Sequence, residues 1–161
     1  MARSLFQYIH PVNVGASGFI AAYEDYSSGN PATDPISLEN YDSVLFLVSK
    51  GAGAVGTATI TVEACSTSGA AATTAIVFDY WVCTTIDTWS DRTRATTAGF
   101  TTTAGADQMY AIEVHSSMLT ATYPFVRLQV TQVDATATDG HIIAILGNSR
   151  YPKEVDISAI T

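Results

Sequence analysis

A strict two-residue alternation in the segment Thr57–Cys65 constrains the fold of this chain most. From Thr57 to Glu63 the odd positions hold threonines and a glutamate, whereas the even positions up to Ala64 hold alanine, isoleucine and valine. Successive side chains of a β-strand point to opposite faces, whereas a helix repeats every ~3.6 residues. The segment therefore predicts a strand with one polar and one apolar face.

Other segments also have strand character, because they are rich in branched and aromatic residues. The continuous apolar run Ser43–Ser49 predicts a buried central strand. We expect Thr57–Cys65 and Ala75–Thr84 to form a long-looped hairpin. The remaining predicted strands are Met109–His115, Phe125–Val133 and His141–Leu146. The last two are expected to pair as a hairpin, since Asp139-Gly140 marks a turn before the final run.

Short strands at regular spacing, without helices between them, predict an all-β fold, either an antiparallel β-sandwich or a jelly roll. A length of 161 residues suits one domain. Glycine and proline punctuate the first forty residues, and the C-terminal segment has no core pattern. We therefore expect an extended N-terminal arm at 1–40, a core at 41–147 and a C-terminal tail at 148–161.

The charge balance excludes several classes of partner. Fifteen acidic and seven basic residues give a formal net charge of −8, which repels nucleic acid, and we expect no direct nucleic-acid binding. No apolar run approaches the ~20 residues of a membrane span, so no membrane partner is expected. The first ten residues do not form a signal peptide, and we expect synthesis as a soluble protein in the cytoplasm.

Motifs for catalysis or cofactors are weak. Gly51, Gly53 and Gly56 match the dinucleotide-binding pattern G-x-G-x-x-G, but an alternating strand segment follows where that motif needs a helix. The three histidines are far apart, and no serine lies in a nucleophile elbow. We expect no enzyme, no cofactor and no metal centre, although the sequence leaves a calcium ion between loops open.

The cysteines and several aromatic residues have other candidate roles. Cys65 and Cys83 are predicted to be two free thiols, since a direct hairpin would separate them by much more than a disulfide allows. Tyr80, Trp81 and Trp89 could stack on a sugar ring. Neighbours in one strand point to opposite faces, however, so packing in the core or in a subunit interface is favoured for Tyr80 and Trp81.

Beyond these patterns, the stretch Tyr41–Pro152 resembles small virion proteins of tailed bacteriophages. The resemblance is carried by these segments: Ser43-Val-Leu-Phe-Leu-Val-Ser-Lys-Gly-Ala, Thr59-Ile-Thr-Val-Glu-Ala-Cys, Phe100-Thr-Thr-Thr-Ala-Gly-Ala-Asp-Gln-Met-Tyr, Tyr123-Pro-Phe-Val-Arg-Leu-Gln-Val-Thr and Ala144-Ile-Leu-Gly-Asn-Ser-Arg-Tyr-Pro. It implies a capsid decoration, or cement, protein of the virion surface, often a homotrimer, with the major capsid protein as partner. A tail or neck component and a carbohydrate-binding adhesin are the alternatives.

These expectations lead to a set of candidate interface residues. We expect Ser4–Tyr23 to add to a neighbouring subunit by strand pairing or groove packing. Arg127 and Arg150 are the basic residues chosen to meet an acidic capsid patch, with a cross-strand carboxylate as the alternative partner of Arg127. The full set is Leu5, Phe6, Tyr8, Ile9, Phe19, Tyr23, Arg127, Arg150 and Tyr151.

Overall fold

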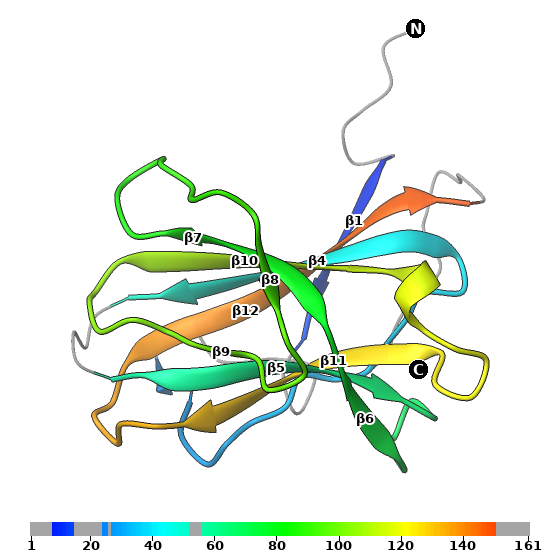
Figure 1. Ribbon diagram of the computed structural model, residues 1–161, viewed down its shortest axis with the longest axis horizontal. Helices are drawn as coiled ribbons and strands as arrows, with labels where there is room; N and C mark the ends of the chain where they lie inside the picture. The colour runs from blue at the N-terminus through cyan, green and yellow to red at the C-terminus, as the bar shows by residue number, and fades with distance from the viewer. Residues whose placement is uncertain (1–7, 15–23, 26, 52–55, 151–161) are drawn as a thin grey trace, which may run out of the picture.

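In the computed structural model, which describes residues 8–14, 24–25, 27–51 and 56–150, two antiparallel sheets pack face to face (Figure 1). The prediction of an all-β sandwich is confirmed. Sheet A has the strand order β1 (Ile9–Asn13), β12 (Asp139–Ser149), β4 (Tyr41–Lys50), β10 (Gln108–His115), β7 (Phe78–Cys83) and β8 (Thr93–Ala95), and β2 (Glu24–Asp25) also pairs with β12. Sheet B has the order β3 (Ile36–Ser37), β11 (Phe125–Gln132), β5 (Ala58–Cys65) and β6 (Thr73–Ile76), and β9 (Phe100–Thr101) also pairs with β5.

Two long antiparallel ladders form the frame of the sandwich. In sheet A, β4 pairs with β12, and in sheet B their sequence neighbours β5 and β11 pair with each other. Both connections therefore cross between the sheets at the same end. There, the backbone amides of Val133 and Asp134 donate to the carbonyl oxygen of Thr57 at 2.9 and 3.1 Å. This corner joins the two sheets.

The core lies between the inner faces of the sheets. In β5 the even residues Ala58, Ile60 and Val62 are fully buried, whereas Thr59 and Thr61 on the opposite face remain partly exposed. The alternation expected for this strand is thus confirmed. β4 is a central strand, paired with β12 on one side and β10 on the other, as predicted. The single 3-10 turn described, Ser116–Met118, follows β10.

Two predicted pairings are corrected by the topology. The segment Ala75–Thr84 divides at Val77, so that β6 pairs with β5 in sheet B while β7 continues into sheet A. The predicted hairpin with Thr57–Cys65 is therefore limited to β6. The expected hairpin of the last two strands does not form, because β11 and β12 lie in different sheets. Alternation predicts a strand and its faces, but it carries no information about the neighbouring strand.

The described parts of the predicted N-terminal arm belong to the sandwich. Ile9–Asn13 pairs with β12 of its own chain rather than with a neighbour, and Ile36 is fully buried opposite Val126. Residues 27–40 thus contribute to the core that we expected to begin at 41. The remainder of Ser4–Tyr23 and the tail from residue 151 lie outside the described residues.

Candidate interaction surface

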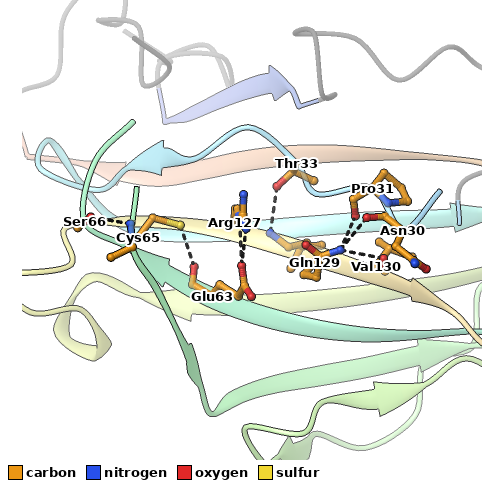
Figure 2. Close-up of polar contacts among 11 residues, drawn as sticks. Asn30, Pro31, Thr33, Glu63, Cys65, Ser66, Arg127, Gln129 and Val130 are labelled. Carbon is orange, nitrogen blue, oxygen red and sulfur yellow. Dashed lines mark hydrogen bonds and ion pairs between the residues drawn. The ribbon is translucent and has the colours of Figure 1, made fainter. Parts of the chain in front are cut away.

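The outer face of sheet B is polar, and its central feature is an ion pair. Arg127 of β11 lies directly opposite Glu63 of β5, and its Nε and Nη2 atoms each lie 2.8 Å from Glu63 Oε2 (Figure 2). Both side chains are about one-fifth exposed, at 21% and 20%. Arg127 therefore has the cross-strand carboxylate partner that the sequence left as its alternative, and this ion pair binds the guanidinium within the sheet.

We expect the Arg127–Glu63 pair to couple more strongly than the surface pair Arg150–Asp42. In a double-mutant cycle, Arg127→Met and Glu63→Gln should show a coupling of about 1 kcal/mol in urea unfolding. The side chains of Arg150 and Asp42 are 45% and 56% exposed. Water screens that pair, so the matched cycle should give a coupling near zero. Equal couplings in the two cycles would contradict this prediction.

The segment Asn30–Thr33 packs along β11 near the ion pair. Gln129 Nε2 donates to the carbonyl oxygens of Asn30 and Pro31 at 2.8 and 3.2 Å, and the amide of Leu128 donates to Thr33 Oγ1 at 3.0 Å (Figure 2). The backbone amides of Thr33 and Val130 complete the contact. These bonds cover the edge of β11 beyond the short strand β3.

Cys65 and Cys83 are free and buried, as predicted. Burial raises the pKa of the Cys65 thiol, and Glu63 acts in the same direction, while Arg127 opposes them. The Cys65 Sγ atom donates to the carbonyl oxygen of Glu63 at 3.7 Å. A protonated, buried thiol is a poor nucleophile, so this geometry indicates a packing role.

Arg150 lies at the other end of the molecule, where it contacts its own chain. Its Nε donates to Asp42 Oδ1 at 3.1 Å and its Nη2 to Ser116 Oγ at 2.9 Å. Beside it is an open hollow of about 440 Å³, lined by Leu38, Glu39, Leu119 and Phe125 among others. Among the other predicted interface residues, Tyr8 is 52% exposed and Ile9 is partly exposed in β1. Leu5, Phe6, Phe19, Tyr23 and Tyr151 lie outside the described residues.

The outer face of sheet A is apolar, in contrast to that of sheet B. Two pairs on adjacent strands form its centre, with Leu47 opposite Ile143 and Leu45 opposite Ile145. All four side chains are partly exposed, while their neighbours toward the core are fully or almost fully buried. The face continues onto both flanking sides through Pro11, Ala111, Trp81 and Met109.

An open face of this kind is unusual for an antiparallel sheet. Such sheets commonly pair one face buried in the core with one polar face in water, and sheet B follows that rule. Runs that are apolar at every position are typical of strands covered on both sides. Ser43–Ser49 and His141–Leu146 were this signal in the sequence, but the predicted interface did not include them. We call the set Pro11, Leu45, Leu47, Trp81, Met109, Ala111, Ile143 and Ile145 the apolar face.

The charged groups that border the apolar face neutralise each other. Asp79 Oδ2 lies 3.2 Å from Arg94 Nη1 and 3.8 Å from Arg92 Nη1. Glu113 lies opposite Asp79 in the ladder of β10 and β7, and its carboxylate is 3.6 Å from His115. Two carboxylates and two guanidinium groups thus balance, so this side of the domain is close to neutral although the whole chain has a formal charge of −8.

The aromatic side chains do not form one platform. Tyr80 stacks on Phe100 with ring centroids 4.1 Å apart and planes at 2°, whereas Trp81, its neighbour in β7, belongs to the outer face. The expectation that the two point to opposite faces is confirmed. Trp89 is 40% exposed on the loop after β7, where Ile86 is 95% exposed. These two residues add an apolar protrusion near the end of sheet A.

Lys50 is the most deeply buried charged residue among those that the structure describes. It is 1% exposed, and its Nζ donates to the carbonyl oxygen of Thr103 at 2.7 Å. The nearby Tyr110 hydroxyl donates to Gln108 Oε1 at 2.7 Å and accepts from the Thr103 amide at 3.0 Å. Burial lowers the pKa of Lys50. The fold therefore disfavours the charged form of this amine.

The lowered pKa predicts a specific pH dependence. Between the pKa of folded Lys50 and the ordinary lysine value of about 10.4, the unfolded chain binds more protons, so stability rises with pH. Below this window the penalty for the buried charge is constant. The free energy of unfolding of the wild type, minus that of Lys50→Met, should therefore increase as the pH is raised through the window. Urea unfolding measures it, with Lys153→Met as control, and a pH-independent difference would contradict it.

The remaining motifs show no chemical site in the described chain. Strand β5 begins at Ala58, so a strand follows the Gly51–Gly56 pattern where a dinucleotide site needs a helix. His10 Nδ1 lies 2.6 Å from the Tyr41 hydroxyl. No group of three or more metal-ligating side chains is found among the residues that the structure describes. In the same residues, no helix has the length and apolar character needed to cross a membrane.

Comparisons with protein-family models, with curated proteins and with solved structures found no match to this chain. A function must therefore be inferred from the surfaces described above.

Proposed function

We propose that this chain is a non-enzymatic virion structural protein that binds a phage capsid surface and stabilises it as a decoration protein. The observation that carries the proposal is the apolar face of sheet A. Contiguous apolar surfaces of more than a few hundred Å² are rare on monomeric proteins and mark sites of association. A sandwich whose central strands are apolar on both sides is completed by a protein partner.

The surroundings of this face favour assembly over catalysis. The polar groups of sheet B are engaged in cross-strand pairs, and the buried polar network around Lys50 and Tyr110 is satisfied by its own members. The major capsid protein is the proposed partner, and the chain is proposed to act as a homotrimer. Because many copies bind one lattice, weak individual contacts add up to firm attachment.

The decisive experiment is electron microscopy of purified virions combined with quantitative mass spectrometry of this protein. Decoration requires density on the head surface and a copy number comparable with that of the major capsid protein. A few copies near the tail would reject decoration and support a tail or neck component. Absence from virions, together with specific binding on a glycan array, would support an adhesin instead.

A further inference from the structure

We propose that the apolar face of sheet A is the interface between copies of this chain. The inference rests on the proposed function and deepens it, because it names the partner at that face. Sheet-on-sheet packing with strands within ~30° of one another is the ordinary way in which two β faces cover each other. A second copy supplies a face of matching width, curvature and chemistry.

The composition of the face is that of a permanent homo-oligomeric contact. Interfaces of transient complexes are about as apolar as the rest of a protein surface, whereas homodimer interfaces are richer in apolar area and resemble a core cut in half. The centre of this face consists of Leu45, Leu47, Ile143 and Ile145, with Trp81 and Met109 beside them. Large aromatic and thioether side chains are enriched at such interfaces.

The size of the face is also sufficient. It extends over β1, β12, β4, β10 and β7. Five strands spaced about 4.8 Å apart give a width of about 24 Å, and the ten residues of β4 at about 3.3 Å each give a length of about 33 Å. The product is about 800 Å², the area that each partner buries in an interface of standard size. The four-residue edge strand β6 offers far less area.

Electrostatics favour this face over the others for contact between like chains. Each copy has a formal charge of −8, so two copies repel unless they meet through a neutral surface. The apolar face is uncharged, and at its border Asp79 is paired with Arg94 and Arg92. The copies therefore approach at the side where the repulsion is weakest.

The test compares the wild type with Leu47→Lys and a matched control, Thr131→Lys. Leu47 lies at the centre of the apolar face, whereas Thr131 is exposed on the outer side of sheet B. Both substitutions make the net charge less negative, so general repulsion cannot explain dissociation. Sedimentation velocity should give a wild-type mass of two or three times 17.0 kDa. Leu47→Lys should weaken association about a hundredfold or more, because it places a charge in a desolvated contact. Thr131→Lys should associate like the wild type.

A second measurement uses the wild type alone and does not depend on the folding of a variant. Hydroxyl-radical footprinting should show that oxidation of Trp81 and Met109 increases when the protein is diluted below its dissociation constant, while Trp89 serves as an internal control. A wild type that is monomeric at its highest soluble concentration would overturn the inference, as would an oligomer in which Leu47→Lys has no effect. A monomer that still occupies the capsid would reject only this inference. An oligomer absent from virions would reject only the proposed function.

Discussion

Phe46→Ala is expected to lower the free energy of unfolding by about 3–5 kcal/mol, because it removes a large side chain from a fully packed site. Phe46 is 0% exposed at the middle of β4, where its register partners are Ala144 on β12 and Ile112 on β10. Its small neighbour Ala144 cannot fill the space that the ring leaves. Urea unfolding followed by tryptophan fluorescence measures the effect.

The control for this prediction is Phe46→Leu, which keeps most of the apolar volume and should cost distinctly less. A loss below about 1 kcal/mol for Phe46→Ala would mean that β4 is not the central strand of a tight core. The result also bears on the proposed interface. Leu45 and Leu47 alternate with Phe46, so packing of its ring fixes the strand that presents the apolar face.

Gly99→Ala is expected to be the most disruptive single-methyl addition outside the corner between the sheets. Gly99 has a φ of +74°, and a Cβ atom at this position would lie 2.0 Å from the carbonyl oxygen of Ile60. That oxygen belongs to the backbone of β5, which cannot move without breaking its ladder with β11. We expect a loss of at least about 2 kcal/mol, since a left-handed conformation and a steric clash act together. Thermal and urea unfolding measure it.

Two other glycines separate these contributions. Gly29 has the same φ of +74°, but a Cβ atom added there would meet nothing within 4 Å, so Gly29→Ala should show the conformational cost alone, about 1 kcal/mol. Gly69 has an ordinary φ, and the atom nearest to an added Cβ would be 3.9 Å away, so Gly69→Ala should be nearly neutral. If Gly99→Ala were no worse than Gly29→Ala, the close approach of the Thr96–Gly99 turn to β5 would be refuted.

The proposed interface explains an otherwise unusual feature of the sandwich. Sheet B solves the problem of a solvent-facing surface with threonines and the Arg127–Glu63 pair, whereas sheet A leaves leucine and isoleucine pairs open. Association of copies through sheet A would leave the polar face of sheet B outward. The acidic charge of the chain would then be concentrated on the outer surfaces of the assembly, where it favours solubility.

Much of the fold could be predicted from local patterns. The faces of β5 followed from its alternation, the central position of β4 from its continuous apolar run, and the free thiols from the lack of a plausible bridge. The interface residues were harder to predict. Arg127 and Arg150 were chosen as free cations, but each has a carboxylate partner, Glu63 and Asp42, that is distant in the sequence. Such pairs depend on strand order, which a single sequence does not contain.

The sequence by itself determined that this protein is built from strands, which faces of those strands are apolar, and that its net charge is acidic. These properties depend on the identity and spacing of neighbouring residues, and the two-residue period of a strand converts them directly into faces. Only the tertiary structure decided that β6 and β7 separate at Val77, that β11 and β12 lie in different sheets, and that the second apolar side of β4 and β12 faces outward. Those features depend on contacts between residues tens of positions apart, whose free energy is set by packing in three dimensions.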